Sequence, residues 1–233
     1  MHPLYDLFAS LPAPPDPIGL YPDYAALRDR FLAARARGDD LETEEAFLTL
    51  YCHVHGHEAP YTAEERARVD RTGGYWSHAG GVSPILRAGP HIRPDTVLGD
   101  FGAGNGLQGL LIQRLFPHRR TVQIEISSRM VEAGRALEGW LGIPPGRVEW
   151  VVGDVLDHSP AGMDFVYLYR PVRPTGEGRA FYEAFAREVG RGVDEVVVFS
   201  IADCLAEFLP ETFRRFYSDG QLTCYRKGAA EEP

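Results

Sequence analysis

The fold of this chain is decided by the stretch Asp100-Phe101-Gly102-Ala103-Gly104-Asn105-Gly106. An apolar run at 96–101 leads into it, and apolar residues at helical spacing continue from it over 106–116. Glycine is favoured at such a strand-to-helix turn because a side chain would block the close approach of a ligand to the backbone. The stretch therefore predicts a ligand-binding loop between a buried strand and a helix.

Beyond residue 73, apolar runs of strand length alternate with amphipathic segments, which is typical of a parallel sheet. Strands are expected at 96–101, 121–126, 148–152, 165–169 and 195–200, and the helices between them at 106–116, 128–141 and 176–189. The end of the chain differs, because the apolar segments 213–217 and 222–225 flank an Asp219-Gly220 pair, a strong hairpin signal. We therefore expect an α/β fold with a doubly wound, mostly parallel sheet and an antiparallel C-terminal hairpin.

The N-terminal third has a different character. Four prolines between positions 12 and 17 predict an extended arm over the first twenty residues. Helical spacing predicts helices at 23–37 and 41–53, and a capping box at Thr62 and Glu65 begins a third helix that runs to about residue 70. Residues 1–72 are thus expected to form a helical cap, and residues 73–233 the ligand-binding domain.

Composition excludes several classes of function. The formal charge of -9 argues against a nucleic-acid partner, since binding to phosphate backbones depends on clustered Lys and Arg. Lys227 is the only lysine, which excludes a phosphate-binding loop that ends in Gly-Lys-Ser/Thr further upstream. No apolar run has the length of a membrane span and no signal peptide is recognisable, so we expect a cytoplasmic protein without a membrane partner. Composition makes no prediction about oligomeric state.

Cysteine and histidine do not form a recognisable metal motif. The three cysteines are scattered along the chain and predict reduced thiols. The segment Cys52-His53-Val54-His55-Gly56-His57 contains potential zinc ligands, but on a helix that ends near Gly56 the histidines would point in different directions. No metal site is predicted.

A second feature indicates what the glycine-rich loop binds. About 20 residues beyond the loop, Glu125 stands near the end of the segment 121–126, where a carboxylate can accept hydrogen bonds from both hydroxyls of a ribose. The loop and this carboxylate together predict a nucleoside site.

At this point the chain, over roughly residues 73–226, resembles the class I S-adenosylmethionine-dependent methyltransferases. Their first motif is Asp/Glu-x-Gly-x-Gly-x-Gly, and their second is an acidic residue that ends the second strand. The sequence Gly153-Asp154-Val155 provides a third match just after the third strand. The resemblance implies a seven-stranded sheet with a reversed last strand, S-adenosyl-L-methionine as cofactor and methyl transfer as the reaction.

The resemblance also implies roles for individual residues. Asp100 would orient the methionine amino group, Glu125 would hold the ribose hydroxyls, and Asp154 would receive the adenine amino group. The three glycines of the loop would admit the methionine and ribose portions, and the N–H of Val155 would face the adenine ring. The cofactor-binding residues predicted in this part of the chain are Asp100, Gly102, Ala103, Gly104, Asn105, Gly106, Glu125, Ile126, Asp154 and Val155.

The acceptor side is expected where the strand 165–169 ends. Methyltransferases of nucleobase or glutamine amino groups carry Asn/Asp-Pro-Pro-Tyr there, whereas this chain has Tyr169-Arg170-Pro171-Val172. The difference argues against acceptors of that kind. Tyr169 and Arg170 are predicted as catalytic candidates, with Arg170 suited to an anionic acceptor. The alternative is that Tyr169 packs in the core and Arg170 pairs with a surface carboxylate.

The segment Tyr75-Trp76-Ser77-His78 precedes the first strand and is flanked by glycines. Many members of the family cover the methionine end of the cofactor with the corresponding segment. Tyr75 and Trp76 are therefore predicted to contact the cofactor, and His78 is a candidate base because its ordinary pKa lies near neutrality. The alternative is plain packing between the cap and the sheet domain.

The predicted function is S-adenosylmethionine-dependent methyl transfer to a small molecule, with a protein side chain as the second choice and RNA as the third. Two alternatives stay open: an NAD-binding protein, because Gly104, Gly106 and Gly109 also satisfy Gly-x-Gly-x-x-Gly, and a nucleoside-binding homologue without catalysis. Asp100, the Gly-Asp pair at 153–154 and the terminal hairpin favour the methyltransferase.

Overall fold

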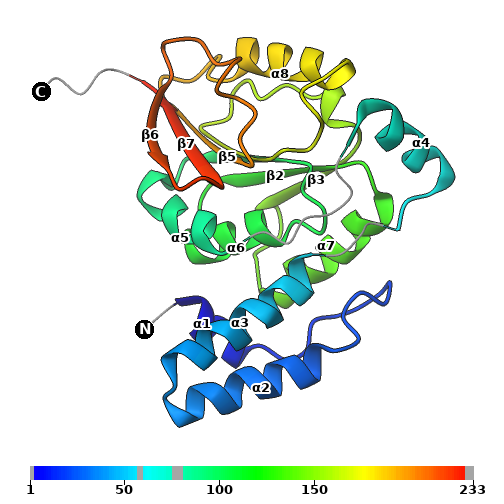
Figure 1. Cartoon of the computed structure of the whole chain (residues 1–233), viewed down its shortest axis with the longest axis vertical. Coiled ribbons are helices and arrows are strands. Elements are labelled where there is room, and N and C mark those ends of the chain that lie inside the picture. The colour runs from blue at the N-terminus through cyan, green and yellow to red at the C-terminus, as the bar shows by residue number, and fades with distance from the viewer. Residues whose placement is uncertain (1–2, 57–59, 75–80, 229–233) are drawn as a thin grey trace, which may run out of the picture.

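The computed structural model describes residues 3–56, 60–74 and 81–228, and within them seven strands form one sheet (Figure 1). The strand order is β3-β2-β1-β4-β5-β7-β6; β1 to β5 are parallel, and β7 runs antiparallel to both β5 and β6. The predicted doubly wound, mostly parallel sheet with a C-terminal antiparallel hairpin is confirmed. The strands are β1 Val97–Phe101, β2 Arg120–Glu125, β3 Val148–Val152, β4 Phe165–Tyr169, β5 Val196–Ile201, β6 Arg214–Ser218 and β7 Leu222–Lys227.

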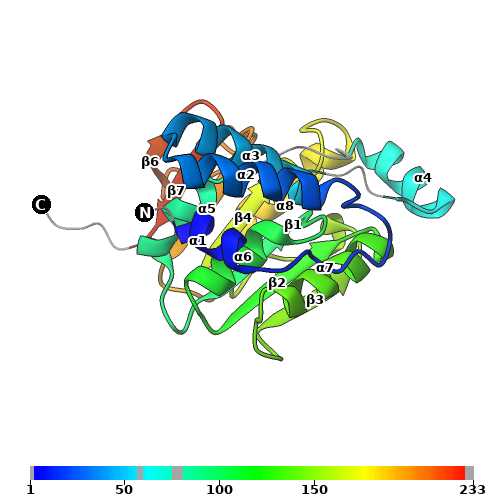
Figure 2. The ribbon, with the colours of Figure 1, turned by 90° about the horizontal axis from the view of Figure 1, so that it is seen from below.

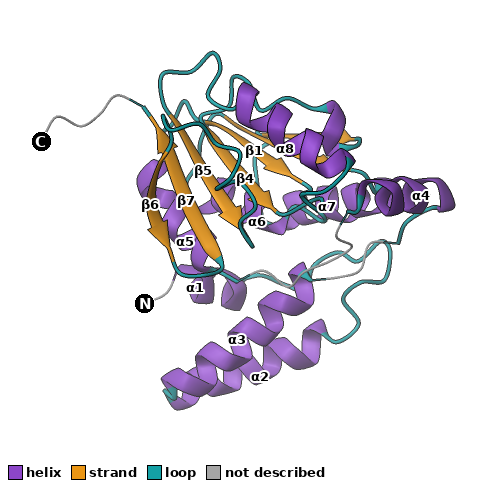
Figure 3. Cartoon of the chain, turned by 45° about the horizontal axis from the view of Figure 1, so that its top comes forward, coloured by secondary structure: helices purple, strands orange, loops and turns teal. Residues whose placement is uncertain are grey.

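Helices cover both faces of the sheet (Figures 1 and 3). Helix α8 (Glu177–Glu188) lies on one face and shares a buried apolar cluster with alternate residues of β1, β4 and β5, among them Phe101, Val166 and Val198. The opposite face carries α5 (Ser83–Ala88), α6 (Leu107–Leu115) and α7 (Ser128–Trp140). The two faces alternate along each strand, as the period of two in a strand requires.

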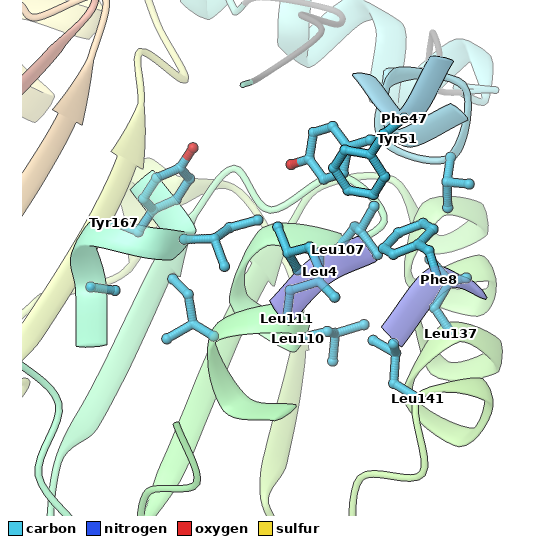
Figure 4. Close-up of a cluster of buried hydrophobic side chains, with 14 of the residues drawn as sticks. Leu4, Phe8, Phe47, Tyr51, Leu107, Leu110, Leu111, Leu137, Leu141 and Tyr167 are labelled. Carbon is cyan, nitrogen blue, oxygen red and sulfur yellow. The ribbon is translucent and has the colours of Figure 1, made fainter. Parts of the chain in front are cut away.

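Three N-terminal helices extend the second face (Figure 2). They are α1 (Pro3–Ser10), α2 (Tyr24–Arg37) and α3 (Asp40–His55). Figure 4 shows Phe8 of α1 beside Leu137 and Leu141, and its ring meets Trp140 edge-on at a centroid distance of 5.8 Å. The N-terminal helices therefore share one buried cluster with α6, α7 and the sheet. The division of the chain at residues 72 and 73 into cap and domain stays a prediction.

The prediction of an extended arm over the first twenty residues is wrong for its first half, because Pro3–Ser10 form helix α1. Pro3 is the first residue of this helix, where a missing N–H costs nothing. The four prolines between positions 12 and 17, on which the prediction of an extended arm was based, all follow the end of this helix. Leu4 and Phe8, four residues apart, are both fully buried, and this contact stabilises a helix too short to form alone.

The fourth helix, α4 (Ala63–Thr72), lies at one end of the sheet (Figure 1). Its predicted capping box is present: Thr62 Oγ1 accepts from the Glu65 N–H at 3.2 Å, and the Glu65 carboxylate accepts from the Thr62 N–H at 2.7 Å. Two short elements before β1, α5 and the 3-10 turn Gly89–His91, were not predicted. Within the described ranges, no helix is long and apolar enough to cross a bilayer.

Candidate ligand site at the carboxyl edge of the sheet

The glycine-rich loop follows β1 and is fixed to β2 by its backbone. The N–H groups of Gly102 and Ala103 both donate to the carbonyl of Ile124, each at 2.9 Å. The N–H of Gly106 donates to the carbonyl of Ala103 at 2.8 Å and closes the turn into α6. The loop is therefore held in one shape before any ligand is bound.

The three glycines of the loop differ in what a side chain would meet. A Cβ on Gly102 would lie 2.9 Å from the Pro171 side chain, and one on Gly106 would lie 2.4 Å from the Trp150 ring. At Gly104 the nearest atom is Met130 Cε, at 4.0 Å. Packing within the protein thus requires glycine at 102 and 106, whereas the space beside Gly104 is open. An open space beside exposed backbone is what a ligand needs.

Glu125 ends β2 and supports the loop. One carboxylate oxygen accepts from the Gly104 N–H and the other from the Ser127 N–H, both at 2.8 Å. Burial raises the pKa of Glu125, and these backbone hydrogen bonds oppose the increase. Because each carboxylate oxygen can accept two hydrogen bonds, Glu125 retains acceptor capacity beside Gly104.

Asp100 is the most unusual group at this edge. It is only 2% exposed, and its Oδ2 has no hydrogen-bond partner among the described residues. Burial is the largest cause that raises its pKa to about 8; the charge of Glu125 adds to the increase, and the Gly109 N–H opposes it. A buried carboxyl group without a cation is costly in the free protein, and a cationic ligand would relieve that cost.

Asp154 lies in the loop after β3, within contact of helix α4. Its Oδ1 accepts from the Leu156 N–H at 3.1 Å, and its Oδ2 lies 3.2 Å from the guanidinium of Arg68. Arg68 also reaches Asp157 at 3.2 Å. The Arg68 contact was not predicted, because the two residues are far apart in sequence. The contact joins α4 to the residue to which the resemblance assigns the adenine amino group.

Asn105 joins the loop to the N-terminal helices. Its Nδ2 donates to Tyr21 Oη at 3.0 Å and to the carbonyl of Val54 at 2.6 Å, while its Oδ1 accepts from the Leu107 N–H at 3.2 Å. The side chain is 1% exposed. A cofactor contact by Asn105 is therefore expected from its backbone and not from its amide group.

Comparison with known proteins was made by sequence and by structure. No protein-family model matches the chain, and no curated protein matches it in sequence. A methyltransferase from Geobacter sulfurreducens is similar in structure, with 17% identity, 95% of each chain covered and a TM-score of 0.50. The chain has the class I methyltransferase fold. A conserved hypothetical protein of Streptococcus pyogenes gives a TM-score of 0.51 with 16% identity and covers 65% of this chain and 97% of its own.

A third similar structure is an RNA methyltransferase from Salinibacter ruber in complex with S-adenosyl-L-homocysteine. It has 24% identity, covers 65% of this chain and 92% of its own, and gives a TM-score of 0.46. At these levels of identity the likeness concerns the fold, and the chemistry of this methyltransferase-fold protein has to come from its site.

The predicted acceptor-side residues follow β4. Tyr169 is half-buried, and burial, with a smaller contribution from Cys52, raises the pKa of its hydroxyl. Arg170 has a φ of 36°, and Ala202, at the end of the neighbouring strand β5, has a φ of 49°. Left-handed backbone at residues other than glycine is strained and is often found at functional sites. The strain lies at the edge where the methyltransferase fold would place an acceptor.

The predictions for Tyr75, Trp76, His78 and His57 fall outside the described residues. The residues on either side of the stretch 75–80, Gly74 and Gly81, contact elements of the sheet domain. Gly74 forms an antiparallel bridge with Val172, and the Gly81 carbonyl accepts from Gln108 Nε2 at 3.0 Å. Within the described ranges, no group of three or more His, Cys, Asp or Glu residues could hold a metal ion.

Two tyrosines at this edge were not predicted as site residues. Tyr51 and Tyr167 lie within a segment predicted as a helix and one predicted as a strand, and both are buried. The available signal was their chemical type, since a tyrosine in the middle of a buried helix or strand needs a partner for its hydroxyl group. Neither hydroxyl has one among the described residues.

Proposed function

We propose that this protein is an S-adenosylmethionine-dependent methyltransferase. The observation that carries the proposal is the buried carboxyl group of Asp100, whose Oδ2 has no hydrogen-bond partner among the described residues. A dinucleotide places a pyrophosphate at this loop, and an anion there would keep Asp100 neutral and gain no charged partner from it. The amino group of S-adenosylmethionine is cationic and suits it. The site therefore favours the sulfonium cofactor over NAD.

The other groups fit the same ligand. Gly104 leaves room for the methionine and ribose portions, and Glu125 has remaining acceptor capacity for the ribose hydroxyls. Asp154 is proposed to receive the adenine amino group with its remaining lone pairs, since its oxygens already contact the Leu156 N–H and Arg68. When bound, S-adenosylmethionine supplies an electrophilic methyl carbon on a charged sulfur. The protein's part is to hold the cofactor and the acceptor in line and to exclude water.

For the acceptor, a small molecule remains our proposal. It is supported by α1 to α3, which pack over the same face of the sheet as Asp100, and by the net charge of -9, which disfavours RNA. Tyr169 and Arg170 are proposed to contact the acceptor, with Arg170 facing an anionic group. A protein side chain is the second candidate.

The proposal predicts that S-adenosylmethionine and S-adenosylhomocysteine bind in a calorimeter and that NAD does not. Glu125→Ala should raise the dissociation constant of S-adenosylmethionine by about tenfold or more, because a charged hydrogen-bonding partner is lost. Glu149→Ala, on the exposed side of β3, is the matched control and should leave the constant unchanged. Tight binding of NAD alone, or unchanged affinity in Glu125→Ala, would contradict the proposal.

Binding near neutral pH should also release about one proton per protein molecule. Asp100 holds its proton there because its pKa is about 8, and the arriving ammonium group favours the carboxylate. The measurement is the binding enthalpy of S-adenosylmethionine in buffers of different ionisation enthalpy. Methylthioadenosine, which lacks the amino group, serves as control and should release none. An S-adenosylmethionine enthalpy that does not depend on the buffer would refute the expectation.

A further inference from the structure

Three buried oxygen atoms at the site have no hydrogen-bond partner among the described residues. They belong to Asp100 on β1, Tyr167 on β4 and Tyr51 on α3. Asp100 and Tyr167 are each 2% exposed and Tyr51 is fully buried. Buried polar atoms in folded proteins are almost always paired, so three unpaired ones from three different elements call for a common explanation.

The three groups lie together. Asp100 and Tyr167 are register partners on adjacent parallel strands, so their side chains leave the sheet on the same face. Figure 4 shows Tyr51 approaching this face from α3, with the hydroxyls of Tyr51 and Tyr167 on the sides of the rings that face one another. Burial raises the pKa of both tyrosines, and the charge of Asp100 raises each further, which also indicates proximity.

The chemistry of the three atoms selects the ligand group. Asp100 is neutral near pH 7 in the free protein, but once a bound cation has displaced its proton it accepts hydrogen bonds and donates none, while tyrosine hydroxyls do either. Gln108 and Gln123, both buried, also have a side-chain oxygen without a partner among the described residues, and a carbonyl oxygen only accepts. A ligand carboxylate would be repelled by Asp100. An ammonium group, with three N–H donors and a positive charge, matches this set of acceptors.

We propose that Tyr51 and Tyr167, together with Asp100, bind the α-ammonium group of the cofactor's amino-acid portion. The inference rests on the proposed function and extends it, because Tyr51 comes from the N-terminal helices and lies outside the stretch that resembles the methyltransferase family. Helix α3 then contributes directly to cofactor recognition and is more than a cover for the sheet.

The experiment compares three ligands on the full-length protein by calorimetry. S-adenosylhomocysteine carries both the ammonium and the carboxylate, decarboxylated S-adenosylmethionine keeps the ammonium, and methylthioadenosine has neither. Tyr51→Phe and Tyr167→Phe should each raise the dissociation constants of the first two ligands by about tenfold and leave that of methylthioadenosine unchanged. Removal of an unpaired hydroxyl keeps the ring packing, so both variants should fold.

Tyr24→Phe is the matched control. Tyr24 is another buried tyrosine of the N-terminal helices whose hydroxyl has no partner among the described residues, but its ring packs edge-on against Trp140. It should change none of the three constants.

The outcomes separate this inference from the proposed function. If Tyr51→Phe weakens all three ligands equally or none of them, the inference is overturned although the cofactor site stands. A loss confined to S-adenosylhomocysteine would assign Tyr51 to the carboxylate and overturn it as well. If the wild-type protein binds none of the three ligands, the proposed function fails first and the inference with it.

Discussion

Replacement of Asp100 by Asn is expected to stabilise the unliganded protein and to remove most of its affinity for S-adenosylmethionine. Folding raises the pKa of this carboxyl group from 3.8 to about 8, mainly through burial. Between these values the folded protein holds a proton that the unfolded chain has lost. The contribution of Asp100 to stability therefore decreases as the pH rises through this window and is constant above it.

Asparagine does not ionise, so the advantage of Asp100→Asn should be small near pH 4 and largest above pH 8, where we expect about 2 kcal/mol or more. The loss of binding comes from the bound state, in which the ammonium group of the ligand needs a negative partner. A buried cation loses its counterion, which typically costs about 2–5 kcal/mol, or roughly 30-fold or more in affinity.

The measurement is a pair of melting-temperature profiles against pH, with calorimetric titration of S-adenosylmethionine. Asp164→Asn is a suitable control, because Asp164 accepts from the Val97 N–H at the opposite end of β1. It should leave cofactor affinity unchanged. An Asp100→Asn protein that binds like the wild type, or melts below it at high pH, would show that the role given to Asp100 is wrong.

The second large effect is a contrast between two glycines of the same loop. Gly104→Ala should fold, since its Cβ meets no atom nearer than 4.0 Å and the cost is the left-handed backbone at φ +59°. It should nevertheless weaken S-adenosylmethionine binding by about 10- to 100-fold, because the methyl group occupies space that the ligand needs. Gly106→Ala should lose about 3 kcal/mol or more of stability, as its Cβ would lie 2.4 Å from the Trp150 ring.

Urea unfolding and calorimetric titration of both variants distinguish the two effects. Each variant is the control for the other, since the same methyl group is added two residues apart. The interpretation of Gly104 fails if Gly104→Ala binds with full affinity. The interpretation of Gly106 fails if its alanine variant is as stable as the wild type.

Local sequence patterns were sufficient for most of the sheet. Strands β3 and β4 have the predicted bounds, because each is a short run of strand-forming residues between clear turn signals. The loop after β1 and the carboxylates at strand ends were predicted since residue type and position together define them. Helix α1 was missed because its stability comes from Leu4 and Phe8, which pack against distant helices.

The parts of the site that were missed depend on contacts between distant segments. Arg68 meets Asp154 across 86 residues, and Tyr51 reaches β4 from a helix that precedes the whole sheet. In the sequence, Tyr51 has the spacing of an ordinary core residue. Only the packing of α3 against the sheet shows that its hydroxyl group is buried on the face that carries Asp100 and Tyr167.

The side-chain amide of Asn105 connects the N-terminal helices to the sheet. It joins the loop after β1 to the last turn of α3 through Val54 and to the loop before α2 through Tyr21. If residues 1–54 were removed or replaced by another segment, the Asn105 amide would lose both of its acceptors. It would then be buried without hydrogen bonds from its Nδ2. The N-terminal helices and the loop after β1 therefore depend on each other to bury this amide with its hydrogen bonds made.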